Sequence, residues 1–236
     1  MSKTDFQIGV IAMLIAAGLS IGDFTGENVL AAQKAAPSSR QDMSRSNEVL
    51  LSAASPFEDL TESALAGNRK GMQAALKAYD EQAAKVSQVL SPKARHDLEL
   101  LVAVIKKAEQ RADSESIARN SVEAYRTLIE SLDAGSLRVP LQVSLLDYAG
   151  FKLKVLLHAK SPDWPALRKT AKEAQQYWTA IKSRVTDKGL QDAVDTAIMG
   201  MNKAATVKNA EMAVFAAQVD LALVDLLEGY FEHLQK

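Results

Sequence analysis

Apolar residues recur every three or four positions along most of the chain beyond residue 46, which is the period of one face of an α-helix. The clearest stripe consists of Leu167, Ala171, Ala174, Trp178, Ile181 and Val185. Two more stripes keep this period, with Leu98, Leu101, Val102, Ile105, Ala108 and Ala112 in one and Ala210, Val214, Ala217, Leu221, Val224 and Phe231 in the other. No segment alternates apolar and polar residues with period two, the pattern of a half-buried strand. We therefore expect an all-α protein made of up-and-down helical bundles.

Breaks between these stripes carry the residues that begin and end helices. Ser91-Pro92 and Ser161-Pro162-Asp163 each offer an N-cap residue with a proline beside it. The segments 132–136 and 186–189 interrupt the periodic pattern, and Pro140 restarts it.

The order of stripes and breaks occurs twice. A shift of 92 residues brings Ser91 onto Ser183 and Val102 onto Val194 without a gap, and the breaks coincide as well. We expect two related four-helix-type units in tandem, residues 47–135 and 136–236, which could also fuse into one longer bundle because a short repeat buries its apolar face against its neighbour.

The first 32 residues differ from the rest. Lys3 precedes an uncharged run from Ile8 to Gly22, which has the length of a signal-peptide core and is shorter than the ~20 residues that span a bilayer. Val29 and Ala31 suit cleavage before Ala32. We expect residues 1–32 to be a signal peptide or an N-terminal membrane anchor and residues 33–46 to be a linker. The body would then work outside the cytoplasm, in a bacterial periplasm, tethered through residues 8–22 if that segment is retained.

Composition narrows the function classes. The formal net charge of −1 and the absence of a basic surplus give no indication of nucleic-acid binding. Without cysteine the chain has no disulfides, thiolate nucleophiles or iron–sulfur ligands. None of the common catalytic motifs occurs, so the sequence does not indicate an enzyme and implies no cofactor.

Asp220 is the most unusual acidic residue, because its neighbours on the helical wheel are apolar. These neighbours are Ala213, Ala216, Ala217, Val224, Leu227 and Phe231. A buried carboxyl group is either paired or has a raised pKa, which makes Asp220 a candidate ligand-binding position. The alternative is a structural pair with a lysine, an arginine or a hydroxyl on a neighbouring helix.

His158 and Asp147 are two further candidates. His158 ends the apolar run Leu145–Leu157, where a cation favours the negative end of the helix dipole. It shares one side of that helix with Asp147 and Phe151, so a ligand site there is the alternative to a structural role.

The remaining metal-type patterns have structural explanations. His96 and Glu99 share a helical face that points away from the apolar stripe, which favours a solvated pair over a metal site. Met199 and Met201 diverge by about 200° on a helix and favour core filling over copper binding. His233 lies close to the C-terminus and is expected in solvent.

The helices around Arg95-His96-Asp97-Leu98 resemble in layout the cytochrome b562-type bundles. In that family, a methionine early in the first helix and a histidine late in the last helix bind haem. Neither half of this chain carries both residues, so only the bundle layout is shared.

Three functions follow as hypotheses. The first is an exported, non-enzymatic binding or interaction module of the cell envelope, with an envelope protein or a small ligand as partner. The second is a metal- or haem-binding periplasmic bundle with ligands from His158, Asp147, Asp220 or the methionines. The third is an enzyme that uses a buried carboxyl group such as Asp220.

Overall fold

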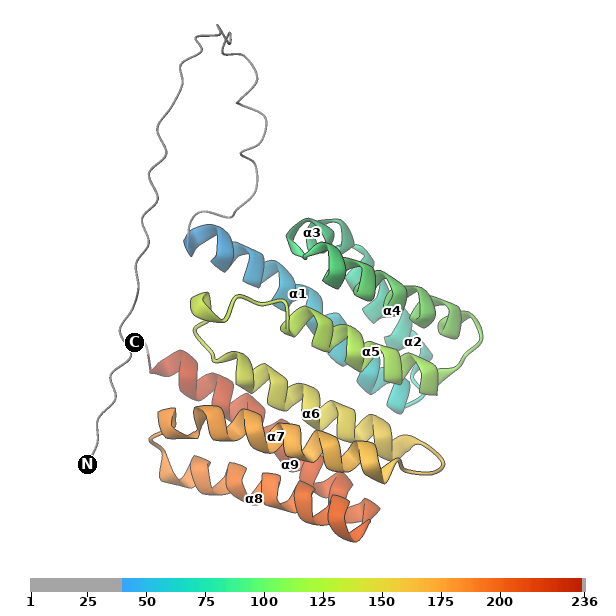
Figure 1. The fold of residues 1–236 in the computed structure, drawn as a ribbon. Coiled ribbons are helices and arrows are strands. Elements are labelled where there is room, and N and C mark those ends of the chain that lie inside the picture. Colours follow the sequence, from blue (N-terminus) through green and yellow to red (C-terminus); the bar gives the residue numbers. More distant parts are fainter. Residues whose placement is uncertain (1–39, 235–236) are drawn as a thin grey trace, which may run out of the picture. The chain divides into compact units, whose positions relative to one another are not determined.

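The computed structural model describes residues 40–234, and this range contains helices and no strand, so the all-α fold is confirmed (Figure 1). The α-helices are α1 (Arg40–Leu65), α2 (Arg69–Asp80), α3 (Ala83–Val89), α4 (Pro92–Gln110), α5 (Ser114–Ile129), α6 (Leu141–His158), α7 (Trp164–Ile181), α8 (Lys188–Val207) and α9 (Ala210–His233). Two short 3₁₀ turns, Ala134–Ser136 and Lys182–Arg184, precede α6 and α8.

The helices form two groups of four, here called the first bundle (α1, α2, α4, α5) and the second bundle (α6, α7, α8, α9). In the first, α1 packs against α2 and α5, and α5 packs against α4. Lys106 of α4 donates a hydrogen bond to Asp80 of α2 at 2.7 Å, and this contact closes a ring of four helices. In the second, α6 packs against α7 and α9, and α8 packs against both of these helices. The order of neighbours is therefore alike in the two groups, while their relation through the 92-residue shift and the boundary at 135/136 remain predictions.

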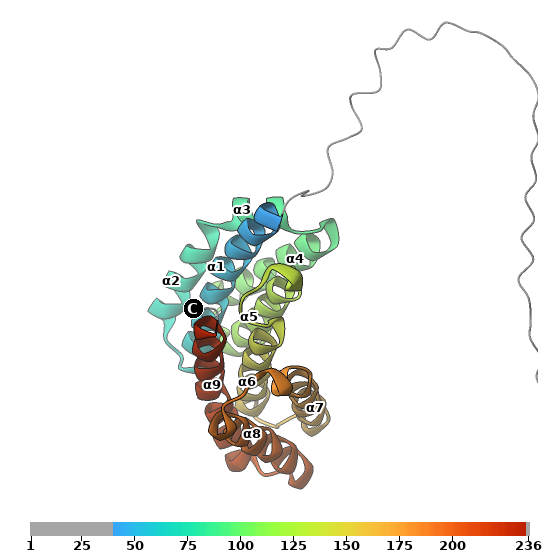
Figure 2. The same ribbon diagram turned by 90° about the vertical axis from the view of Figure 1, so that its left-hand side faces the viewer.

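Helix α6 belongs to both bundles. One set of its side chains packs into the first core, namely Leu145, Tyr148, Phe151 and Val155. A second set packs into the other core, namely Val143, Leu146, Ala149 and Leu153. A helix with apolar residues on two opposite faces is stable only when both faces are covered, so α6 lies in the middle of the molecule (Figures 1 and 2).

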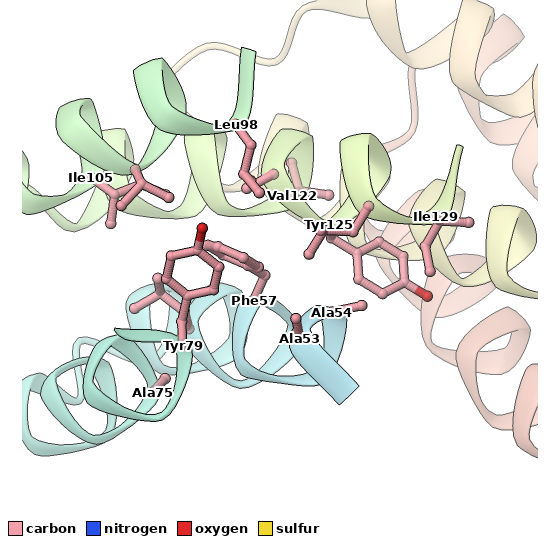
Figure 3. Close-up of a cluster of buried hydrophobic side chains, with 14 of the residues drawn as sticks. Ala53, Ala54, Phe57, Ala75, Tyr79, Leu98, Ile105, Val122, Tyr125 and Ile129 are labelled. Carbon is pink, nitrogen blue, oxygen red and sulfur yellow. The ribbon is translucent and has the colours of Figure 1, made fainter. Parts of the chain in front are cut away.

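Aromatic residues centre each core. In the first, the rings of Phe57 and Tyr79 lie 4.7 Å apart in a tilted arrangement (Figure 3). In the second, Trp178 is fully buried and its indole nitrogen donates to Asp195 at 2.7 Å. Lys182 donates to the other oxygen of Asp195 at 2.6 Å, so the carboxylate is paired on both sides.

Helix α1 continues through Pro56, which cannot donate the hydrogen bond that Ser52 would accept one turn earlier. Gln82, in the turn between α2 and α3, supplies a replacement. Its amide nitrogen donates to the Ser52 carbonyl at 3.3 Å, and the Ser52 hydroxyl donates back to the Gln82 amide oxygen at 2.8 Å. The proline is thus accommodated by a side chain from a neighbouring element.

Several details differ from the sequence expectations. Helix α1 begins at Arg40, so residues 40–46 of the expected linker are helical, because no glycine or proline stands between Pro37 and Pro56. Helix α4 ends at Gln110, and Ala112 lies beyond it with a positive φ of 55°. The cap of α7 is Asp163, which accepts from Ala166, whereas Ser161-Pro162 precedes the helix.

The stripe expected on α9 is confirmed only in part. Ala217, Val224 and Phe231 are buried, as predicted. Val214 is 37 % exposed, and the buried face also includes Ala213, Ala216, Leu223 and Leu227. By contrast, all members of the stripe on α7 and the turn after it are buried, as predicted. An alanine-rich helix offers several faces of similar hydropathy, which explains the error on α9.

The expected signal peptide or anchor lies outside the described residues, as does the expected cleavage site. Among the helices of residues 40–234, none combines the length and the apolar character that crossing a bilayer requires.

Two glycines provide a matched test of the α6–α9 contact. A Cβ added to Gly150 of α6 would lie 2.7 Å from Leu221 Cδ2 and 3.1 Å from Asp220 Oδ2 of α9, whereas one added to Gly229 would meet nothing within 4 Å. We expect Gly150→Ala to lower the free energy of unfolding by about 1–2 kcal/mol, since overpacking outweighs the gain in helix propensity. Gly229→Ala should raise it by up to about 1 kcal/mol. Urea unfolding measures both, and equal changes would contradict the close packing described here.

Candidate functional site

A polar hollow surface lies between α1 and α9, with α6 as its floor. It consists of two adjoining hollows of about 440 Å³ each, which share Glu228 of α9. In Figure 2, α1 and α9 lie on the same side of the molecule, beside α5 and α6. We call the two hollows together the acidic groove.

Carboxyl groups dominate the lining. Glu48, Glu228 and Glu232 line the first hollow. The second hollow is lined by Glu228 again and by Glu58, Glu62, Asp147 and Asp225, so the groove has seven carboxyl groups in all. The one positively charged side chain in the lining is Arg138. Lys154 lies nearby, 3.5 Å from Glu62 and over the ring of Phe151.

Helical spacing places these acids on facing surfaces. On α1, Glu48, Leu51, Glu58 and Glu62 fall on one side of the helix, since they are separated by multiples of three and four residues. On α9, Asp225, Glu228 and Glu232 follow the same rule. Like charges at such spacing repel by a few tenths of a kcal/mol per pair, so α9 carries an unfavourable run here.

The centre of the groove is a hydrogen-bonded group of three side chains from three helices: Glu58 of α1, Tyr125 of α5 and Asp147 of α6. The two carboxyl groups are hydrogen-bonded to each other, and the Tyr125 hydroxyl is within hydrogen-bonding reach of both. The same hydroxyl lies 3.3 Å from the Ser144 carbonyl. Figure 3 shows Tyr125 at the edge of the first core with its hydroxyl pointing out of the apolar cluster.

Burial makes ionisation of this group difficult. Desolvation raises the pKa of Glu58 to about 7, although the hydrogen bonds from Asp147 and Tyr125 act in the opposite direction. Desolvation and then the charge of Glu58 raise the pKa of Asp147 well above its usual value. The pair therefore takes up a proton at a higher pH than ordinary carboxyl groups do, and one carboxyl group can then donate that proton to the other.

Glu228 stands at the rim, where the two hollows meet. Partial removal from water by the groove walls raises its pKa, and the neighbouring charges of Asp225 and Glu232 add to the rise. The groove thus brings carboxyl groups together in surroundings that disfavour their ionised form.

Asp220 lies outside the acidic groove, in the contact between α6 and α9. It is 1 % exposed, as the helical wheel predicts, but the expected pairing is wrong for its Oδ2 atom, which has no hydrogen-bond partner. Gly150 of α6 lies opposite this oxygen. Desolvation alone raises the pKa of Asp220 well above its usual value, so burial favours the neutral form of the side chain.

The structure does not gather the three predicted candidates into one site. Asp147 lies in the acidic groove, Asp220 is enclosed between two helices, and His158 is exposed at the end of α6. His96, Glu99 and His233 are exposed, as expected.

Core filling, which the sequence favours for both methionines, is confirmed for Met201, which is buried in the second core, and is wrong for Met199, which is 65 % exposed. The two methionines therefore do not lie together as metal ligands. Within residues 40–234, no group of three or more His, Cys, Asp or Glu residues is arranged to hold a metal ion.

Comparison of the chain with protein-family models, with curated proteins and with solved structures finds no match. The function therefore has to be argued from the chemistry of the molecule itself.

Most residues of the acidic groove were missed by sequence reasoning, which identified Asp147 alone. The available signal was the run of acids on one face of α9, Asp225, Glu228 and Glu232, where repulsion is expected. Glu58 gave no local signal, because its neighbours in the groove come from α5 and α6.

Asp220 should make stability depend on pH. Because its pKa is raised in the folded state, the folded protein keeps a proton that the unfolded chain releases above its ordinary pKa of about 4. The free energy of unfolding then falls as pH rises from that value to the raised pKa, by up to about 1.4 kcal/mol per pH unit. We expect Asp220→Asn to match the wild type near pH 4.5 and to exceed it increasingly at pH 6 and pH 8 in urea unfolding.

Glu211→Gln, which removes an exposed carboxyl group from the same helix, is the control and should leave the slope between pH 6 and pH 8 unchanged. A difference between Asp220→Asn and the wild type that stays constant with pH would show that Asp220 is ionised in the folded protein.

Proposed function

We propose that this protein is an exported, non-enzymatic binding module whose acidic groove takes a positively charged segment of a partner protein. The observation that carries the proposal is the lining of the groove, in which seven carboxyl groups face a single arginine. Complementary charge is the usual means by which such a surface selects its partner and accelerates encounter.

The charge of the groove is not balanced from within. Glu62 has a partner in Lys154, while the other acids of α1 and α9 in the lining have no ion pair within 4.0 Å inside the described part of the chain. Lysine or arginine side chains of a ligand would relieve this repulsion, and bidentate arginine–carboxylate pairs would add directional hydrogen bonds.

The dimensions of the groove favour a peptide over a single ion. The wall formed by α1 runs from Ser44 to Glu62, which is about 27 Å at the rise of an α-helix. An extended peptide covers that length with about eight residues. Leu51 and Phe151 give such a peptide apolar contacts between its charged positions.

Proton release accompanies binding in this proposal. Glu58 has a pKa of about 7, so its carboxyl group titrates near neutral pH. A bound cation favours the ionised form and lowers that pKa. By linkage, the affinity for a cationic peptide rises as pH increases through 7.

Location outside the cytoplasm is a second part of the proposal, and the sequence of residues 1–32 supports it. We expect the mature protein recovered from its native host to begin near Ala32, because small residues precede that position. Cell fractionation with N-terminal sequencing tests this part separately. An unprocessed chain in the cytoplasm would refute export and leave the binding proposal standing.

Binding is tested with a fluorescent hexalysine peptide and fluorescence anisotropy. We expect saturable binding that weakens steeply with added salt, since exposed charges are screened. Glu58→Gln combined with Glu228→Gln should weaken binding about tenfold or more, because two charged hydrogen bonds are lost. Equal affinity of this double variant and the wild type would refute the acidic groove as the site.

The matched control combines Glu81→Gln with Glu211→Gln, which changes the net charge equally at exposed positions outside the groove. It should stay within about twofold of the wild type, since screened surface charges contribute little. From pH 6 to pH 8, the wild type should bind several-fold more tightly while Glu58→Gln changes less. Identical pH profiles would contradict the role given to Glu58.

A further inference from the structure

A hollow separate from the acidic groove, and of different chemistry, lies beneath α3 in the first bundle. It has a volume of about 280 Å³, near the lower end of the roughly 300–1,000 Å³ of ligand pockets, which suits a small molecule. Its walls are mainly apolar and include Ala83, Val86, Leu90 and Leu98. Its polar members are chiefly Arg95 and Glu99 of α4 and Tyr79 of α2. We call it the Arg95 pocket.

Arg95 is the feature that sets this pocket apart. Its Nε atom is buried and has no hydrogen-bond partner. A buried donor on a charged group loses its hydration without compensation, which is unfavourable unless something else supplies an acceptor. Of the side-chain atoms in the described chain, only Arg95 Nε and Asp220 Oδ2 are buried without a partner, and Arg95 is the one that lines a hollow.

Glu99 is the obvious partner, because it lies four residues after Arg95 on the same helix. Such pairs commonly close, and the neighbouring Lys93 and Asp97, at the same spacing, are 2.5 Å apart. Arg95 and Glu99, by contrast, form no ion pair within 4.0 Å. A positive and a negative group therefore both face the pocket without neutralising each other.

We propose that the Arg95 pocket binds a free α-amino acid with an apolar side chain. The carboxylate of the ligand accepts hydrogen bonds from the Arg95 guanidinium, its ammonium group pairs with Glu99, and its side chain packs against Val86, Leu90 and Leu98. This arrangement satisfies the buried Nε atom and gives each charged group of the pocket an opposite charge.

Tyr79 adds a donor for the same carboxylate. Its hydroxyl points toward α4, the helix that carries Arg95 (Figure 3). Burial, followed by the charges of Asp80 and Glu99, raises the pKa of Tyr79 to about 12. The phenol therefore keeps its proton at neutral pH, where the ligand carboxylate is ionised.

The test is a titration of the full, ¹⁵N-labelled chain with L-leucine, followed by NMR. We expect saturable shifts of the amides of residues 83–89 below about 10 mM leucine. 4-Methylpentanoate, which lacks the ammonium group, and 3-methylbutylamine, which lacks the carboxylate, should each bind about tenfold more weakly or worse. Absence of saturable shifts with leucine, or equal binding of all three compounds, would overturn the proposal.

Variants assign the contacts. Arg95→Met should weaken leucine binding about tenfold or more, whereas Lys107→Met, a change of an exposed cation on the same helix outside the pocket, should not. Glu99→Gln should weaken leucine binding and strengthen 4-methylpentanoate binding, because the repulsion of the ligand carboxylate is removed. Ala84→Leu fills the pocket from an exposed position and should abolish binding in a folded protein. Leucine affinity unchanged in Arg95→Met or in Ala84→Leu would place the ligand elsewhere.

Discussion

The burial of α6 on two opposite faces is the constraint on which the rest of the structure depends. Four of its apolar residues complete the first core and four complete the second. The valine, leucine and phenylalanine side chains among them each contribute about 1.5–3 kcal/mol when fully removed from water. Neither bundle has a closed core without this helix. Because α1 and α9 pack against α6 from different directions, the hollow that separates them is fixed by the same packing, and the polar residues of α6 form its floor.

Much of this fold could be predicted from the sequence, because amphipathic stripes with clear caps report directly on helices. The stripe around Trp178 and the cap at Ser91 are examples. The failures have one cause. Where apolar residues occur on several faces of a helix, their spacing no longer indicates which face is buried. Helix α9, rich in alanine, was assigned a face that includes the exposed Val214. The sharing of α6 between two cores was invisible for the same reason.

The acidic groove was less predictable than the fold, since its properties arise between helices. The wheel of α9 places Asp220 on the buried side, but only the packed structure shows that Gly150, and no cation, lies opposite it. The pKa of Glu58 depends on Tyr125 and Asp147, which are 67 and 89 positions away in the chain. The sequence likewise contained no signal for Arg95, because only the structure shows that this residue does not pair with Glu99.

The position of α6 in the chain has a consequence for biosynthesis. Translation delivers α1 to α5 before α6, and chains tend to fold in the order in which they emerge. During that interval the surface of the first bundle that α6 later covers faces water, and Glu58 has neither Asp147 beside it nor a wall that excludes solvent. The part of the desolvation that α6 contributes, which raises the pKa of Glu58 in the finished molecule, is then absent. The nascent first bundle therefore exposes more apolar surface than it does in the finished molecule, and its Glu58 ionises more readily. The Glu58–Asp147 pair can share a proton only after α6 has docked.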